Sequence, residues 1–112
     1  MHEQSTLNIL AQSDNGYIGE CECCHEFNFV YKNILLIFQQ EELFRFLDWL
    51  ISYRKHDDTY LPLPHGTSRV YRSPLNNMFL AFHEHELDEL TTLFTEAQII
   101  LEVRSLLTNN DC

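Results

Sequence analysis

The segment Phe27-Asn-Phe-Val-Tyr-Lys-Asn-Ile-Leu-Leu-Ile-Phe38 decides the fold that we predict for this chain. Its aromatic residues at 27, 29 and 31 take alternate positions, which is the spacing of one face of a β-strand. Ile34 to Phe38 is a continuous apolar run, short enough for a buried strand. Lys32-Asn33 lies between the two runs and has the length of a hairpin turn. The segment therefore predicts an antiparallel hairpin.

A helix over residues 40–54 should follow this hairpin. Gln39-Gln-Glu-Glu42 places acidic residues in the first turn, where the helix dipole favours them. One helical face then collects the large apolar side chains Leu43, Phe46, Trp49, Leu50 and Tyr53. Upstream, we expect a strand at Leu7–Ala11, a turn at Ser13-Asp-Asn-Gly16 and an extended segment from Tyr17. This first hairpin leads into a group of cysteines.

The order of patterns recurs later in the chain. Residues 28–54 and 68–98 each read as strand, turn, strand and helix, and a Pro/Gly loop over 56–67 joins them. The apolar positions of the second helix, Leu87, Leu90, Leu93, Phe94 and Ala97, match those of the first; two unrelated amphipathic helices could also match by chance. We predict a single α+β domain, 1–112, with an antiparallel sheet and with helices 40–54 and 84–106 packed on one face.

The first helix carries a second apolar stripe, Phe44, Leu47 and Ile51. Such a stripe, if exposed, favours aggregation, so something should cover it. The apolar segment 99–107 can do so from within the chain, as a continuation of the second helix or as a further one. A second copy of the chain can do so from outside. We expect a homodimer through the first helix, and a protein partner that the sequence does not name.

Charge and hydropathy exclude several classes of function. The net charge is −10, with 7 Lys and Arg scattered among 17 Asp and Glu, so a nucleic-acid or anionic-membrane surface is not expected. No apolar run reaches the roughly 20 residues of a membrane-spanning helix. The first residues lack the pattern of a signal peptide. We therefore expect a cytoplasmic protein, where clustered cysteines are more often ligands or redox groups than disulfides.

Cys21-Glu-Cys-Cys-His25 is the candidate metal site. Cys21 and Cys24 form a Cys-x-x-Cys pair, a spacing that lets two thiolates on a tight turn bind one Zn²⁺. Cys23 and His25 lie within the same segment. The site can close with His25, His56 or His65, or across a dimer in which each chain gives Cys21 and Cys24.

Two other interpretations use the same cysteines. Cys21 and Cys24 can act as a thiol-disulfide redox pair, although acidic neighbours such as Glu22 should raise the thiol pKa and the pair precedes a strand rather than a helix. The cysteines can also be small packing residues. His83-Glu-His-Glu86 resembles ligand chemistry, but we interpret it as the acidic first turn of the second helix. No Ser/His/Asp grouping, phosphate-binding Gly loop or pair of catalytic carboxylates is evident.

Three short motifs resemble a family of small uncharacterised bacterial proteins known only as a domain of unknown function. They are Tyr17-Ile-Gly-Glu-Cys-Glu-Cys-Cys24, Phe29-Val-Tyr-Lys-Asn-Ile34 and Glu42-Leu-Phe44. Cys21, Cys24, Asn33, Glu42 and Phe44 match the family pattern, whereas Lys32 replaces the usual Gly of the turn. The resemblance covers most of the chain and implies no activity.

The sequence thus favours a non-enzymatic binding or interaction module, with structural zinc at Cys21, Cys23, Cys24 and His25 as its candidate cofactor. A redox protein that uses Cys21 and Cys24 is the alternative.

Overall fold

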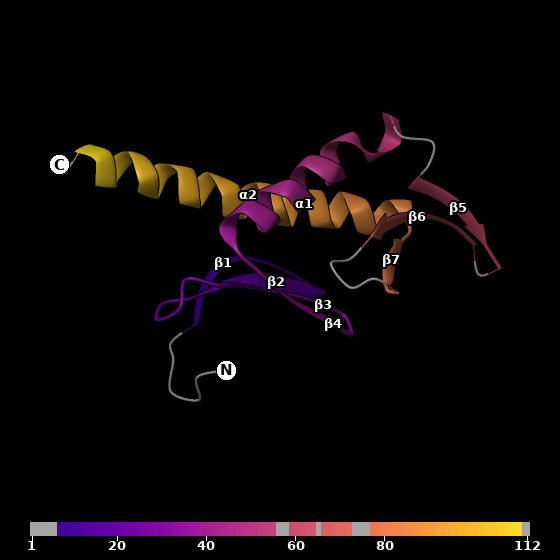
Figure 1. The fold of residues 1–112 in the computed structure, drawn as a ribbon, viewed down its shortest axis with the longest axis horizontal. Coiled ribbons are helices and arrows are strands. Elements are labelled where there is room, and N and C mark those ends of the chain that lie inside the picture. The colour runs from indigo at the N-terminus through magenta and orange to yellow at the C-terminus, as the bar shows by residue number, and fades with distance from the viewer. Residues whose placement is uncertain (1–6, 56–58, 65, 73–76, 111–112) are drawn as a thin grey trace.

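The computed structural model describes residues 7–55, 59–64, 66–72 and 77–110, and two antiparallel sheets and two helices dominate it (Figure 1). The predicted α+β class is confirmed, but the described strands form two sheets instead of one. In chain order the elements are β1 (Leu7–Ser13), β2 (Gly16–Cys21), β3 (Phe27–Tyr31), β4 (Ile34–Phe38), α1 (Gln40–Ser52), the 3₁₀ turn η1 (Tyr53–Lys55), β5 (Tyr60–Leu63), β6 (Gly66–Arg72), β7 (Phe79–Phe82) and α2 (Glu84–Asn110).

The first sheet is a meander in the order β1-β2-β3-β4. Phe27, Phe29 and Tyr31 of β3 are all buried, as their alternation predicted, and they face the helices. The turn between β3 and β4 is closed by Lys32 and Asn33, with Tyr31 paired to Ile34. The left-handed residue of this turn is Lys32 (φ 52°), although Asn, the residue type at the next position, tolerates this conformation more readily.

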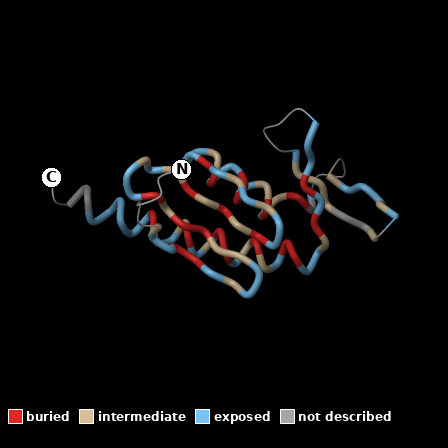
Figure 2. The backbone as a smooth tube through the Cα atoms, turned by 90° about the horizontal axis from the view of Figure 1, so that it is seen from below, coloured by how far each residue is buried: buried red, intermediate tan, exposed pale blue. Residues whose placement is uncertain are grey.

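Both helices cover the same face of the first sheet (Figure 1). At the start of α1, the Glu42 carboxylate accepts a hydrogen bond of 2.8 Å from the Gln39 backbone N–H, so an acidic first turn caps the helix as expected. Phe29, Phe46 and Phe94 bring β3, α1 and α2 together, with the Phe94 ring 4.9 Å from each of the other two ring centres. Figure 2 shows the buried residues alternating along the strands beneath these helices.

The second sheet has the order β5-β6-β7 and lies beside the N-terminal end of α2 (Figure 1). Our prediction of a loop over 56–67 was wrong for its described second half, because Tyr60–Leu63 pairs with β6 as an edge strand. The two Leu-Pro steps that suggested a loop also hold the backbone extended, and an edge strand tolerates Pro62 because one side of it needs no N–H donors. His56 and His65 lie outside the described residues.

Each of the segments 28–54 and 68–98 forms a hairpin followed by a helix, although the hairpins belong to different sheets. Their registers differ as well. Phe27 pairs with Phe38 in the first hairpin, whereas Arg69, the counterpart of Phe29, pairs with Phe82 in the second. The duplication therefore stays a prediction.

The structure contradicts one expectation about apolar surface. Ile34–Phe38 is not buried on both faces: β4 is an edge strand on which Leu35 and Ile37 are half-exposed. Segment 99–107 continues α2, one of the arrangements that the sequence left open for covering the second stripe of α1. Within that stripe Leu47 is buried inside the chain, Phe44 packs partly against the core and Ile51 is 64 % exposed.

The C-terminal half of α2 extends past the rest of the molecule (Figure 1). The radius of gyration is 15.2 Å and the longest dimension is 51 Å. A compact domain of this length has a radius of gyration of about 13 Å, and the molecule is longer because α2 extends at one end and β5 and β6 extend at the other (Figure 1). Among the described residues, no helix combines enough length and apolar character to cross a membrane.

Candidate metal centre

The cysteines occupy the turn that joins β2 to β3 at one end of the first sheet. Two backbone hydrogen bonds close this turn: the Cys21 N–H donates to the Glu26 carbonyl at 2.9 Å, and the His25 N–H donates to the Cys21 carbonyl at 3.0 Å. His25 adopts a left-handed backbone (φ 58°) that reverses the chain just after Cys24. The local backbone therefore folds three cysteines into one compact turn.

The three thiols converge. The sulfur atoms of Cys21, Cys23 and Cys24 all lie within 4.8 Å of one another, and those of Cys21 and Cys23 are 3.4 Å apart. Three sulfurs bound to one zinc ion at about 2.3 Å each would be separated by roughly 3.8 Å, so small side-chain movements suffice. Cys21 is buried, Cys24 is half-buried and Cys23 is exposed, which leaves the cluster reachable from solvent.

Hydrogen bonds within the cluster make one cysteine more acidic than the others. The thiol of Cys24, and secondarily that of Cys23, donates toward the Cys21 sulfur and lowers the pKa of Cys21 to about 7. The same interaction raises the pKa of Cys24 to about 11 and raises that of Cys23. We expected the acidic neighbours to raise the thiol pKa values; for Cys21 this was wrong, because its closest partners are thiol donors and not carboxylates. A metal ion would find one thiolate ready near pH 7 and would displace the remaining protons.

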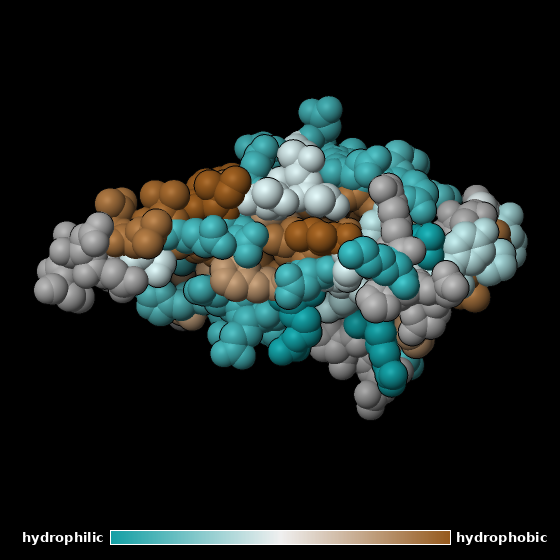
Figure 3. Space-filling model, turned by 90° about the horizontal axis from the view of Figure 1, so that it is seen from above, coloured by the Kyte–Doolittle hydropathy of each residue, from teal (hydrophilic) through white to brown (hydrophobic). Residues whose placement is uncertain are grey.

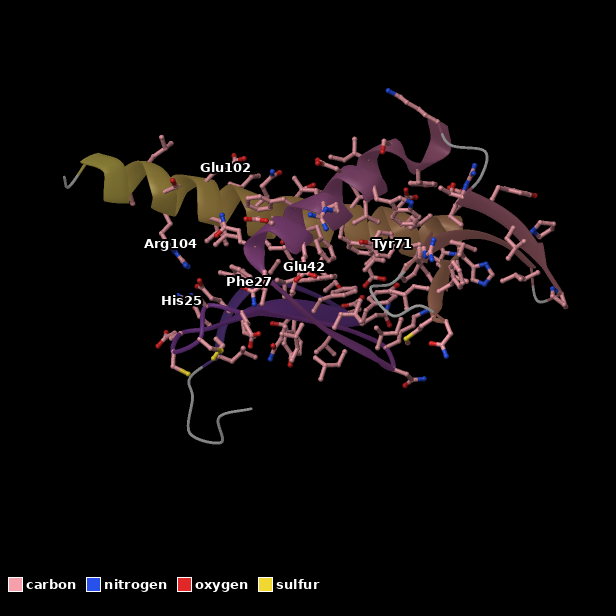
Figure 4. The ribbon with its side chains drawn as sticks, in the orientation of Figure 1. His25, Phe27, Glu42, Tyr71, Glu102 and Arg104 are labelled. Carbon is pink, nitrogen blue, oxygen red and sulfur yellow. The ribbon has the colours of Figure 1, made fainter. Side chains whose placement is uncertain are left out.

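His25 is not part of this group of sulfurs. Its side chain lines a cavity of about 530 Å³ between the end of the sheet and α2, together with Asn8, Glu20, Glu22, Gln40, Leu101, Arg104 and Ser105. An ion pair of 2.5 Å between Arg104 and Glu20 spans this cavity, and Figure 4 shows Arg104 extending from α2 toward the turn that carries His25. Among the described residues, no fourth His, Cys, Asp or Glu joins the three cysteines.

The other histidine-rich segment has a structural role. The His83 backbone N–H donates to the Glu86 carboxylate at 2.8 Å, which caps the start of α2. The other oxygen of Glu86 lies 2.6 Å from the ammonium of Lys32. The rings of His83 and His85 stack with their centres 5.6 Å apart. The interpretation of this segment as an acidic first turn is therefore supported.

The model of the family described as "Family of unknown function (DUF6686)" matches residues 1–111. The chain belongs to this family. The search of the curated proteins and the search of the solved structures found no match. The resemblance to a family of unknown function is confirmed, whereas the bacterial origin and the motif that we associated with that family stay predictions.

Sequence patterns did not reveal the contacts between Glu20 and Arg104 or around Glu89. The Glu89 carboxylate accepts hydrogen bonds from Asn15 and Tyr31, which are 74 and 58 residues away in the chain. No periodicity links residues at such separations, so only the folded chain places them together.

Proposed function

We propose that this protein is a non-enzymatic binding module in which Cys21, Cys23 and Cys24 hold a structural zinc ion. The observation that carries the proposal is the convergence of three sulfur atoms within 4.8 Å on a single turn. Thiolates are soft ligands that suit zinc. Because the three cysteines lie within a turn of five residues, little conformational entropy is lost when they are brought together around one ion.

The position of the turn favours a structural role for the metal. Cys21 ends β2, and Phe27, the first residue of β3, is buried in the core. A metal ion held by the three thiolates would fix the connection between these two strands and neutralise sulfur charge that lies among Glu20, Glu22 and Glu26. The fourth ligand of a tetrahedral site would come from solvent, from a further residue or from a partner molecule.

The test is the metal content of the chain, purified without a tag and under reducing conditions. We expect about one zinc ion per chain in the wild type, a clearly lower ratio in Cys24→Ser, which keeps only two of the three thiolates, and an unchanged ratio in Cys112→Ser, which alters the cysteine outside the turn. Because metal binds the folded chain, chelation should lower the melting temperature by roughly 10 °C. A wild type that takes up no zinc, or a Cys112→Ser variant that loses it as Cys24→Ser does, would disprove the proposal.

A thiol-disulfide redox protein is the second candidate, and the low pKa of Cys21 favours it. In that reaction the Cys21 thiolate attacks one sulfur of a substrate disulfide and releases the other sulfur as a thiolate. Cys24 then loses its proton to water and displaces the bound sulfur, which leaves a Cys21–Cys24 disulfide and a fully reduced substrate. The interaction with the Cys21 thiolate that raises the pKa of Cys24 ends once Cys21 is bound in the mixed disulfide, which makes Cys24 easier to deprotonate for this second step.

Alkylation with iodoacetamide at pH 7 separates the two candidates. A zinc site predicts that Cys21 reacts slowly in the purified protein and quickly after chelation. A redox pair predicts fast reaction without chelation, together with reduction of an added small disulfide such as oxidised glutathione.

A further inference from the structure

The C-terminal half of α2 carries a row of apolar side chains that the rest of the chain leaves uncovered. Among the residues of the helix whose burial is described, up to Leu107, Leu101 is the last that is buried, at 7 % exposure. Around it and beyond it, five large apolar residues are 40 to 64 % exposed: Ile99, Ile100, Val103, Leu106 and Leu107. We call these five residues the terminal stripe. Figure 3 shows apolar surface gathered on this part of the helix.

The terminal stripe is one continuous side of the helix. Each residue of an α-helix is turned by about 100° from the one before it, so the five side chains spread over about 120° with Val103 at the centre. Leu101 falls on nearly the opposite side, and its burial shows that this opposite side faces the core. The terminal stripe therefore points away from the body of the molecule.

We propose that the terminal stripe pairs with the same stripe of a second copy of this chain. From their exposed fractions, the five residues present roughly 500 Å² of apolar surface on each copy, which is at the upper end of what monomers usually leave exposed. Two copies that cover both stripes bury about 1,000 Å², which is the lower limit for a specific interface. The expected complex is thus a weak homodimer whose population depends on concentration. It does not require the proposed zinc site.

Charge favours a second copy that runs in the same direction. The chain has a net charge of −10, so two copies repel each other over most of their surface. The terminal stripe, however, has one acidic residue on one border, Glu102, and one basic residue on the other, Arg104. In a parallel two-fold pair, each Arg104 shares a border with Glu102 of the second copy; in an antiparallel pair, like charges share a border. Arg104 keeps its bond to Glu20, and its side chain is 43 % exposed.

Sedimentation equilibrium of the full chain under reducing conditions tests the interface. The wild type should show a reversible monomer–dimer equilibrium. Val103→Glu, which places a charge at the centre of both stripes, should raise the dissociation constant at least tenfold. Ile37→Glu, an equally polar change at a 50 % exposed site on β4, should leave the dissociation constant unchanged. Should Val103→Glu fail to fold by circular dichroism, Leu106→Gln, at a 64 % exposed position of the same stripe, takes its place with the same expected loss.

A wild type that stays monomeric at every concentration would overturn the proposal, and so would a Val103→Glu variant that dimerises as well as the wild type. The direction of pairing has its own test. Glu102→Arg should weaken a parallel dimer several-fold at low salt, because it sets two cations on each border, while Asp48→Arg on α1 makes the same change in net charge away from the stripe. Equal dissociation constants for these two variants would contradict parallel pairing.

Discussion

The carboxylate of Glu89 on α2 lies 2.8 Å from the hydroxyl oxygen of Tyr31 on β3. The same carboxylate accepts hydrogen bonds from the side-chain amide of Asn15 at 3.0 and 3.2 Å and from its backbone N–H at 3.3 Å. Asn15 belongs to the β1–β2 turn and Tyr31 ends β3, so one charged group fixes two neighbouring ends of the sheet against the helix. Burial alone would raise the pKa of Glu89, but the hydrogen bonds from Ser13, Asn15 and Tyr31 outweigh it and lower the pKa to about 2.

Glu89 should make the stability of the fold depend on pH in the acid range. Its pKa is lower in the folded chain than in the unfolded chain, so its contribution is present above the unfolded value near 4.5 and is lost as the pH falls toward about 2. Urea unfolding measured between pH 6 and pH 3 should show a steeper loss of stability in the wild type than in Glu89→Gln. Parallel pH profiles for the two chains would argue against this assignment.

Removing the Glu89 carboxylate should also cost stability at neutral pH. Glu89→Ala leaves Tyr31 and Asn15 without their acceptor, and hydrogen bonds to a charged group contribute about 1.5–3 kcal/mol. Tyr31→Phe removes one donor and leaves the carboxylate its other partners, so it should cost less, about 1 kcal/mol. Urea denaturation at pH 7 measures both. A larger loss in Tyr31→Phe than in Glu89→Ala would reverse the expected order.

Lys32 holds a left-handed backbone and an ion pair at once. Lys32→Asn keeps a residue that tolerates positive φ but removes the ammonium that lies 2.6 Å from Glu86. The ammonium end is partly exposed, so we expect a loss of less than about 1 kcal/mol. Lys32→Val introduces a β-branched residue that does not tolerate this backbone, so it should lower the stability clearly more. Thermal denaturation of both variants measures the two losses. Equal losses would show that the backbone conformation carries no cost.

The acidity of Cys21 should depend on its thiol neighbour. In metal-free protein, the rate of Cys21 alkylation should rise with a midpoint near pH 7, because the thiolate is the reactive form. Cys24→Ala removes the main hydrogen-bond donor and should shift this midpoint upward, toward the ordinary thiol value of about 8.5. Cys112→Ala serves as the control. A midpoint that Cys24→Ala leaves unchanged would remove the thiol hydrogen bond as the cause.

Phe46 should be among the most sensitive residues of the core. It is fully buried and contacts Phe29, Phe94 and Tyr71, which come from two strands and a helix. Phe46→Ala should cost about 3–5 kcal/mol because it leaves a cavity where three elements meet. Ile51→Ala, on the exposed side of the same helix, should change the free energy of unfolding by no more than about 0.5 kcal/mol.

Periodicity predicted the elements that pack against the core. The alternation at Phe27, Phe29 and Tyr31 and the apolar face of α1 are local patterns, and burial in the structure follows them closely. The convergence of Cys21, Cys23 and Cys24 could also be predicted from the sequence, because a tight turn brings residues that are close in sequence together in space. His25 lines the neighbouring cavity and does not join the three sulfur atoms, so its place among the ligands stays a prediction.

What the sequence could not provide depends on residues that are distant along the chain. Residues 60–63 form a strand because they pair with β6. Leu47 is buried by neighbouring elements, and the sequence of its own helix does not show that they lie there. The hydropathy of the terminal stripe would predict that its residues are buried in the core. It is exposed because α2 is longer than the body that it packs on.

X-ray absorption at the zinc edge of the zinc-loaded wild type tests the central claim most directly. The proposed site predicts three sulfur neighbours at about 2.3 Å and one further ligand, with the sulfur signal reduced to two in Cys24→Ser and unchanged in Cys112→Ser. A first shell made only of nitrogen and oxygen, or a sulfur signal that Cys24→Ser leaves intact, would contradict a zinc site on this turn.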